Sequence, residues 1–379
     1  MNSGFHWHAQ ARLFDGAGRE YGSTRFSAGL IAERPAGLAV AQAIAAGAFR
    51  VGGAGPVPMC GFETLTSGSS GAPRRITRSF DSWTRSFVVN AGLFGIGPGL
   101  PVAVLGRLSQ SLALYGALEG MYLGAEVHLL EDLRPDRQAA ALRAIALIYA
   151  TPAQMRLVVV AGVAWPKLRH LVIGGSKLDA GLRAAILALA PDVRITEFYG
   201  AAEASFITMA GPDCPEQSVG RAYPGVELRV LDQEIWVKSP YLFAGYAGGD
   251  PGGAVWQDGF LSVGEMGAMR DGFLYLKGRA GRMVTVADQN VFPEEIEVFL
   301  LGLDGVRLAA VVPVADSLRG LHLVAVLQGD PGQEPAILRA LRQRLGPLTA
   351  PKRLVWRGDW PVLPSGKTDF RAIADEVAG

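Results

Sequence analysis

The stretch from residue 79 to residue 198 alternates short apolar runs with segments of helical periodicity, and this alternation constrains the fold most. Phe80, Trp83 and Phe87, for example, stand at the spacing of one helix face. The expected strands are residues 101–105, 127–130, 145–150, 170–173 and 194–198, and the expected helices are residues 79–93, 112–123, 136–144 and 180–190. This order predicts an α/β fold with a mainly parallel sheet and helices on its faces.

The segments on either side of this stretch have a different character. Residues 1–60 are rich in Ala and Gly, with one helix expected at 38–49. Short segments separated by Gly, Asp and Pro predict a small β-rich subdomain over residues 220–278. They are residues 227–231, 234–238 and 273–276. Beyond them, a helix beginning at Pro293, strands at 308–313 and 321–328 and a helix at 334–345 predict a compact α+β module. We therefore expect a large domain over 1–278 and a C-terminal domain over 279–379.

Composition limits the classes of partner. With 379 residues, 49% of them hydrophobic, the chain is long enough for a large core, and a net charge of +1 gives no argument for binding nucleic acid. Apolar stretches such as 112–130 are interrupted by Glu119, Glu126 and His128, so no membrane span is expected. Two cysteines without CxxC spacing, and an N-terminus without a signal-peptide pattern, predict a cytoplasmic protein without a disulfide framework.

Hydroxyl and glycine residues are concentrated just before the alternating stretch. They are Thr66, Ser67, Gly68, Ser69, Ser70 and Gly71, followed by Pro73 and Arg74. Glycines let backbone N–H groups approach an anion, hydroxyls add donors, and arginine adds positive charge. The segment therefore suits a polyphosphate, although composition alone favours a Ser/Gly-rich surface turn.

Two strand ends of the predicted sheet carry loops suited to a nucleotide, since ligands collect at the carboxyl ends of parallel strands. The first loop is Gly174-Gly175-Ser176, and the second is Tyr199-Gly200-Ala201-Ala202-Glu203. Glu197 and Phe198, at the end of the strand before the second loop, are also expected to contact the cofactor. Tyr199 offers a flat ring for a purine, and Glu203 is a hard ligand for a magnesium ion that bridges phosphates. Further along, Glu265 could accept the ribose hydroxyls, and Lys367 stands on a glycine-supported turn.

This ordered set resembles the adenylate-forming superfamily of acyl- and aryl-CoA synthetases, peptide-synthetase adenylation domains and luciferases. The resemblance covers about residues 63–373 and lies closest to small acyl-CoA synthetases. The matching positions are the phosphate loop at 66–73, Tyr199, Glu203, Glu265, Arg279, the asparagine-and-proline stretch at 290–297 and Lys367.

The resemblance implies an ATP-dependent acid–thiol ligase with ATP, Mg²⁺ and CoA as cofactors. A fatty or aromatic carboxylic acid would be activated as acyl-AMP and passed to CoA. Lys367 and Arg74 would stabilise charge during the first step, and Glu203 would hold the metal. Two alternatives stay open: transfer to the phosphopantetheine arm of an acyl carrier protein, and a non-catalytic nucleotide- or acyl-binding homologue.

Several positions depart from the family pattern. Arg74 replaces a lysine, Ala202 a threonine, Glu265 an aspartate and Gly281 a hinge acid, and Asp288 stands where a glycine lines the CoA tunnel. The N-terminal subdomain is also shortened. In the family this region helps to wall the acyl pocket and, in some members, forms a dimer contact, so a homodimer is one candidate assembly.

Overall fold

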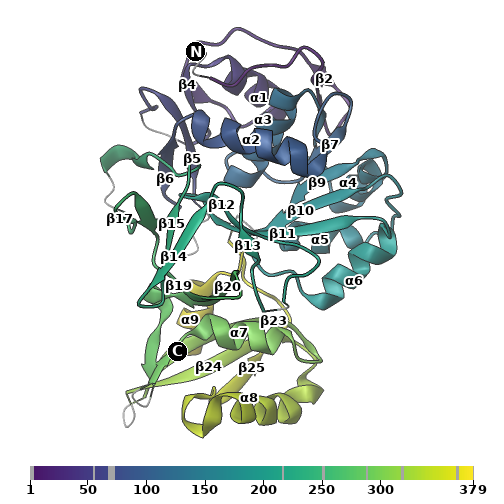
Figure 1. The fold of residues 1–379 in the computed structure, drawn as a ribbon. Helices are drawn as coiled ribbons and strands as arrows, with labels where there is room; N and C mark the ends of the chain where they lie inside the picture. Colours follow the sequence, from purple (N-terminus) through teal and green to yellow (C-terminus); the bar gives the residue numbers. More distant parts are fainter. Residues whose placement is uncertain are drawn as a thin grey trace. The chain divides into compact units, whose positions relative to one another are not determined.

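The computed structural model describes residues 4–53, 56–66, 73–215, 217–249, 252–286, 289–316, 320–363 and 367–378. The chain forms two compact units (Figure 1). The first unit holds the residues up to Leu228 together with Val237–Leu261, and the second holds Arg229–Trp236 and the residues from Ser262 onward. This division follows packing, and the boundary expected between residues 278 and 279 stays a prediction.

A nine-stranded sheet organises the first unit. In spatial order its strands are β13 (Arg221–Ala222), β12 (Ser205–Ala210), β11 (Arg194–Ala201), β10 (His170–Gly174), β9 (Leu147–Ala150), β7 (Pro101–Val104), β8 (Glu126–Leu129), β1 (Arg12–Asp15) and β2 (Glu20–Tyr21). The strands from β11 to β1 run parallel, and only the edges are antiparallel. The mainly parallel sheet predicted from the alternation is confirmed.

Helices cover both faces of this sheet because successive strand residues point to opposite sides. Val102 and Val104 of β7 belong to one buried cluster, with α1 (Ala36–Ala45), α2 (Asp81–Phe94) and α3 (Ser111–Leu123). Ala103 and Leu105 belong to another, with α4 (Pro135–Ala141), α5 (Pro152–Val159) and α6 (Ala180–Leu189). The two helix layers lie on either side of the sheet in Figure 1.

A five-stranded sheet completes the N-terminal part. In order it contains β16 (Gly245–Tyr246), β6 (Arg75–Arg78), β5 (Gly61–Leu65), β4 (Ala48–Val51) and β3 (Leu30–Ile31). The helix expected at 38–49 is therefore wrong in its second half, since α1 ends at Ala45 and Phe49 lies in β4. Phe49 pairs with Phe62 of β5, and burial of both rings favours the strand over a longer helix.

Short hairpins form the β-rich region, as the sequence predicts. They are β14 (Glu227–Leu231) with β15 (Glu234–Lys238), β17 (Val255–Gln257) with β18 (Phe260–Ser262), and β19 (Glu265–Arg270) with β20 (Phe273–Arg279). The turn residues Asp258, Gly259, Asp271 and Gly272 all have positive φ, as two-residue hairpin turns require.

The C-terminal part of the second unit is a three-stranded sheet between helices. Its strands are β23 (Val306–Asp316), β24 (Gly320–Gly329) and β25 (Arg353–Trp356), and its helices are α7 (Pro293–Leu301), α8 (Glu334–Thr349) and α9 (Phe370–Ala378); a hairpin, β21 (Val284–Val286) with β22 (Gln289–Val291), precedes α7. Val311 packs with α7 and α8, whereas Val312 packs with α9. Within the described ranges, no helix has the length and apolarity that a bilayer crossing needs.

Candidate active site

The predicted phosphate loop leaves β5 at Thr66 and returns to β6 through Arg74. The Thr66 N–H donates to the Arg74 carbonyl over 2.8 Å, and the Arg74 N–H donates to Thr66 Oγ1 over 2.9 Å. These two bonds join the ends of the loop. Ser67, Gly68, Ser69, Ser70 and Gly71, which we expect to bind phosphate, lie outside the described residues.

Arg74 and Glu203 both lie next to Tyr246, a residue that the sequence reasoning missed. The Arg74 guanidinium carbon is 5.7 Å from the centroid of the Tyr246 ring. The Tyr246 hydroxyl donates to Glu203 Oε1 over 3.0 Å. Burial raises the pKa of Tyr246 to about 12, and the adjacent Glu203 carboxylate adds to the rise, so this hydroxyl stays a donor at neutral pH. Two residues that the sequence predicts to serve one triphosphate are thus brought together.

The pairing of strands sets this arrangement. Tyr246 of β16 stands opposite Ile76 of β6, the strand that begins directly after Arg74. On the other side, the Phe243 N–H donates to the Glu203 carbonyl over 2.7 Å. One short segment, residues 243–246, therefore contacts both the strand that follows the phosphate loop and the turn that carries Glu203.

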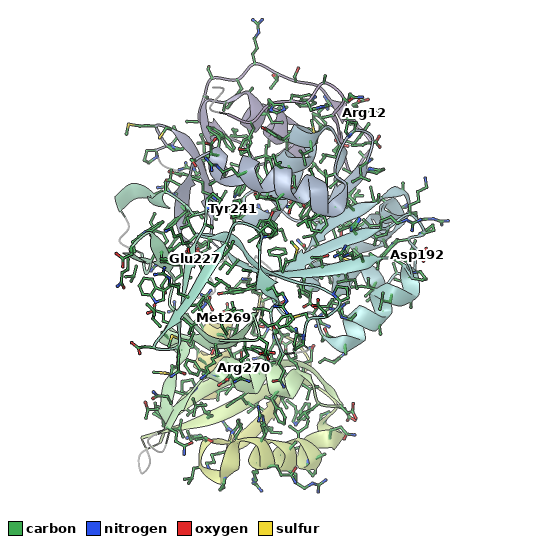
Figure 2. All side chains as sticks on the ribbon, viewed as in Figure 1. Arg12, Asp192, Glu227, Tyr241, Met269 and Arg270 are labelled. Carbon is green, nitrogen blue, oxygen red and sulfur yellow. The ribbon has the colours of Figure 1, made fainter. Side chains whose placement is uncertain are left out.

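A buried arginine supports the same turn. Arg78 is 1% exposed. It donates to the Ser205 hydroxyl and, over 2.7 Å, to the carbonyl of Tyr241, which is labelled in Figure 2. Burial lowers the pKa of Arg78 to about 9, while the Glu203 charge opposes that shift. Ser205 has a φ of 58°, a strained value for a residue with a side chain. Arg78 therefore holds the turn in place. Its position two residues after Ile76, on the same inward face of β6, is the feature of the sequence that could have indicated this role.

The Gly174-Gly175-Ser176 segment begins at Gly174, the last residue of β10. A Cβ atom at Gly174 would lie 2.5 Å from the Phe198 ring, so glycine is needed there for packing. Glu197 Oε2 accepts from the Leu178 N–H over 3.2 Å, and Arg183 forms an ion pair with Glu197 Oε1. Glu197 therefore shapes the backbone that follows Ser176, and a role for it in cofactor binding stays a prediction.

The second predicted loop is partly strand. Tyr199, Gly200 and Ala201 continue β11 and pair with β12, with a register shift between Tyr199 and Gly200. The turn itself is only Ala202–Ala204, and a Cβ atom at Gly200 would lie 2.1 Å from the Ser205 carbonyl oxygen. Close pairing of two backbones therefore replaces the expected loop and holds Tyr199 and Glu203 at the end of one hairpin.

The ribose-binding candidates lie in the second unit. Glu265 and Arg279 stand opposite each other in β19 and β20, and Arg279 Nε donates to Glu265 Oε1 over 2.9 Å. Burial raises the pKa of Glu265, whereas the charges of Arg279 and Lys367 lower it. The charge of Lys367 therefore acts on the Glu265 carboxyl group. The Lys367 carbonyl accepts from the Leu363 N–H over 2.8 Å.

Glu203 also has the chemistry that a magnesium ion needs. Carboxylate oxygen is the preferred ligand, and Mg²⁺ in nucleotide sites takes one or two carboxylates besides phosphate oxygens. Among the described residues, no group of three His, Cys, Asp or Glu side chains could enclose a metal by itself. A magnesium ion at Glu203 stays a prediction.

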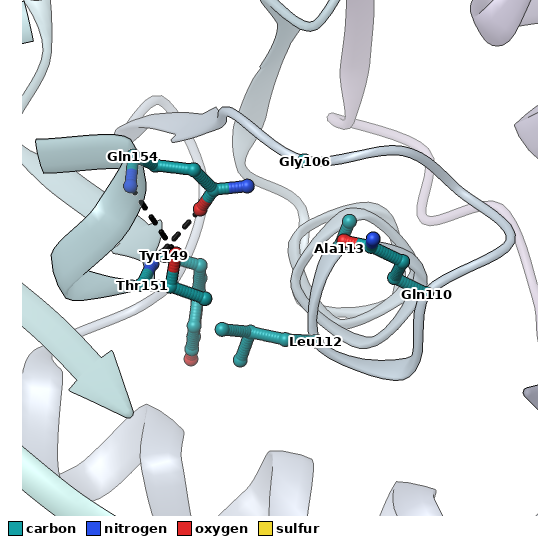
Figure 3. A pocket seen from close by; sticks show the side chains of 7 residues that line it. All are labelled: Gly106, Gln110, Leu112, Ala113, Tyr149, Thr151 and Gln154. Carbon is teal, nitrogen blue, oxygen red and sulfur yellow. Dashed lines mark hydrogen bonds between the residues drawn. The ribbon is translucent and has the colours of Figure 1, made fainter. Parts of the chain in front are cut away.

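A small indentation lies at the carboxyl ends of β7 and β9 (Figure 3). It has room for about 10 Å³, the size of one water molecule, and is partly open to solvent. Its lining residues are Gly106, Gln110, Leu112, Ala113, Tyr149, Thr151 and Gln154. Gly106 and Gln110 lie between β7 and α3, and Leu112 and Ala113 lie in the first turn of α3.

Two sequence models of one enzyme family match the chain. The AMP-binding enzyme model matches residues 63–247, and the AMP-binding enzyme C-terminal domain model matches residues 295–367. Together they span more than half of the sequence and contain Arg74, Glu203 and Lys367. The protein therefore belongs to the AMP-binding, adenylate-forming family of enzymes.

Particular relatives fit this family. The chain is 32% identical over 322 residues to the uncharacterized acyl–CoA ligase YhfT of Bacillus subtilis (strain 168). This match covers 80% of this chain and 66% of that protein. The chain is 26% identical over 350 residues to the fatty acid–[acyl-carrier-protein] ligase ScoC of Streptomyces coeruleorubidus, covering 84% and 67%. The solved structure of the amide bond synthetase McbA from Marinactinospora thermotolerans matches with a TM-score of 0.73 at 26% identity, covering 84% and 69%. The chain thus spans about two thirds of the length of these relatives.

Proposed function

We propose that the protein is an ATP- and magnesium-dependent ligase that activates a fatty or aromatic carboxylic acid as acyl-AMP and transfers the acyl group to CoA. The observation that carries this proposal is the cluster of Arg74, Tyr246 and Glu203 at the base of the phosphate loop. A cation, a hydroxyl and a carboxylate in one place suit a triphosphate and its metal. Membership of the AMP-binding family and the acyl–CoA ligase relatives support the same reaction class.

In the first step, a carboxylate oxygen of the acid attacks the α-phosphorus, the bond to the β-phosphate oxygen breaks, and pyrophosphate leaves. Arg74 and the donors of the phosphate loop would bind the leaving pyrophosphate. Lys367 would offset the charge between the attacking carboxylate and the α-phosphate. Glu203 would hold magnesium, which neutralises phosphate charge when bound. Tyr199 would stack on the adenine, beside Gly174, Gly175 and Ser176, and Glu265 with Arg279 would hold the ribose.

In the second step, a thiol attacks the acyl carbon of the adenylate and AMP leaves, so that a thioester forms. CoA is the proposed acceptor. A carrier-protein phosphopantetheine is the second candidate, since ScoC is named a fatty acid–[acyl-carrier-protein] ligase and Asp288 would repel a negatively charged free cofactor. Parallel assays with CoA, with a holo-carrier protein and with a simple amine would identify the acceptor, the amine because McbA is named an amide bond synthetase.

The first step is tested by ATP–pyrophosphate exchange over a panel of acids. The Lys367→Ala substitution should lower the exchange rate by about 100-fold, because it removes one electrostatic contact to the reacting phosphate. Lys352→Ala is the matched control, since the exposed side chain of this lysine in the second unit is described with one hydrogen bond, to the Pro347 carbonyl, and the variant should retain the full rate. Equal exchange in the two variants would refute the role of Lys367. ATP binding by calorimetry without exchange for any acid would favour the non-catalytic alternative.

A further inference from the structure

The indentation in Figure 3 adjoins the base of the phosphate loop. Gln110, at its rim, forms a β-bridge with Leu65, the residue before Thr66. The next residue, Ser111, donates its hydroxyl to Thr64 Oγ1 over 3.0 Å. An acid in this indentation would therefore have its carboxylate near the predicted site of the triphosphate and its remaining atoms directed toward the interior.

One side of the indentation is fixed by a helix N-terminus. Thr151 and Gln154 form a reciprocal capping box at the start of α5, with the Thr151 N–H donating to Gln154 Oε1 over 2.8 Å (Figure 3). A Cβ atom at Gly106, across the opening, would lie 2.8 Å from Gln154 Nε2. The gap between Gly106 and Gln154 is thus narrow, and the capping box at the start of α5 fixes the position of Gln154.

Tyr149 closes the inner end. Its side chain is 1% exposed, and Figure 3 shows Leu112 extending toward it. A Cβ atom at Gly116 would lie 2.7 Å from Tyr149 Cδ2, so the ring rests directly on the backbone of α3. One helical turn further, Glu119 accepts a short hydrogen bond from the Tyr149 hydroxyl. The backbone at Gly116 therefore supports the face of the Tyr149 ring, and Glu119 holds its hydroxyl group.

The space behind Tyr149 is filled by polar side chains. Glu119 is fully buried and also accepts from Asn90 Nδ2 over 2.9 Å and from the Tyr115 hydroxyl over 3.1 Å. Tyr115 is hydrogen bonded to Ser86 Oγ at 2.7 Å, and the Tyr223 hydroxyl donates to Asn90 Oδ1 over 2.8 Å. Swinging Tyr149 aside would break its bond to a buried carboxyl group and direct an alkyl chain into this network, and both changes are unfavourable.

We propose that Tyr149, held by Gly116 and Glu119, is the floor of the acyl pocket and restricts the protein to short-chain carboxylic acids. This inference rests on the proposed ligase function. The indentation has room for about 10 Å³, the size of one water molecule, so it has no space beyond the ring for an alkyl chain. An alkyl chain that enters the indentation meets the Tyr149 ring, and a longer chain would have to displace it.

The test is a chain-length profile of kcat/KM from ATP–pyrophosphate exchange, with acetate, butyrate, hexanoate, octanoate and dodecanoate. The wild-type protein should prefer acetate or butyrate and lose roughly 10-fold or more on reaching octanoate. Tyr149→Ala should raise the ratio of octanoate to butyrate by at least about 10-fold, since the ring no longer blocks the chain. Tyr149→Phe keeps the ring on Gly116 but removes its hydrogen bond to Glu119, so it should change the preference less than the alanine variant does. Tyr149→Leu serves as a milder truncation if the alanine variant does not fold.

Binding gives a second readout that does not need turnover. Non-reactive acyl-sulfamoyl adenosines of the same chain lengths should raise the melting temperature of the wild type most for the short acyl groups. A wild type that activates dodecanoate as well as butyrate, or truncations that leave the profile unchanged, would overturn the role of Tyr149 while the ligase function stands. No exchange with any acid would instead overturn the ligase function, and this inference with it.

Discussion

The buried carboxyl group of Glu119 should make the stability of the first unit depend on pH, and Glu119→Gln should remove that dependence. Glu119 has no cationic partner among its described contacts, which are Asn90, Tyr115 and Tyr149. Burial raises its pKa to about 8, against the opposing effect of these three hydrogen bonds. At neutral pH the folded protein therefore keeps Glu119 protonated.

The sign and the size follow from proton linkage. Between the unfolded pKa of 4.5 and the folded value of about 8, the native state binds a proton that the unfolded state has lost. The stabilisation is thus fully present below the lower value and disappears as the pH rises through the higher one. Linkage gives a loss of about 2 kcal/mol between pH 6 and pH 8 for this single group. Glutamine has the shape of the protonated acid and can offer the same donor and acceptor, so its variant should not show this loss.

The assay is urea unfolding followed by circular dichroism at pH 6, 7 and 8, for the wild type and for Glu119→Gln. The free energy of unfolding should be similar at pH 6, and the variant should be more stable by about 2 kcal/mol at pH 8. The other titrating groups cancel in the difference between the two proteins. Two curves that stay parallel from pH 6 to pH 8 would show that Glu119 is ionised in the folded protein, and the reasoning would fail.

Two further substitutions test contacts of the site. Gly174→Ala should destabilise the first unit by about 1–3 kcal/mol in urea unfolding, because its Cβ atom would lie 2.5 Å from the Phe198 ring. Gly92→Ala on the exposed side of α2, where a Cβ atom meets nothing within 4 Å, should instead be neutral or slightly stabilising. Arg74→Lys should lower kcat/KM for ATP by about 2- to 5-fold, since the charge stays but the planar group over Tyr246 is lost. Arg85→Lys, at an exposed ion pair, should leave kcat/KM unchanged, and equal losses in both variants would argue against a specific contact at Arg74.

The sequence predicts the elements that bury one continuous face and misses those that need a distant partner. The helices α2 and α6 and the strands β14 and β15 lie close to their predicted positions because the pattern of their own residues defines them. The strands β2, β3 and β16 have two residues each, too few for any alternation to be read. The five-stranded sheet that contains β3 and β16 is assembled by long-range pairing, so no local pattern in residues 1–60 indicates it.

The same distinction applies to the site. Arg74 and Glu203 stand in motifs and could be read directly, whereas Tyr246 stands in no motif and reaches Glu203 only because β16 pairs with β6. Glu119 was visible as a charge within an apolar helix, which already implies hydrogen-bonding partners in the core. Its partners could not be named, because Asn90 and Tyr149 come from other elements of the sheet and helix layers.

The cluster around Tyr246 also changes the meaning of the substitution at position 74. A lysine is a flexible point charge, whereas the arginine guanidinium is planar and can lie over an aromatic ring. Here the ring is that of Tyr246, 5.7 Å from the Arg74 guanidinium carbon, and the same tyrosine donates its hydroxyl to Glu203. Replacing lysine by arginine therefore adds a link between the phosphate loop and the proposed metal ligand. A chain that had lost nucleotide chemistry would have no need to keep the cation, the ring and the carboxylate in contact, so this departure from the family pattern favours an active ligase over a non-catalytic homologue.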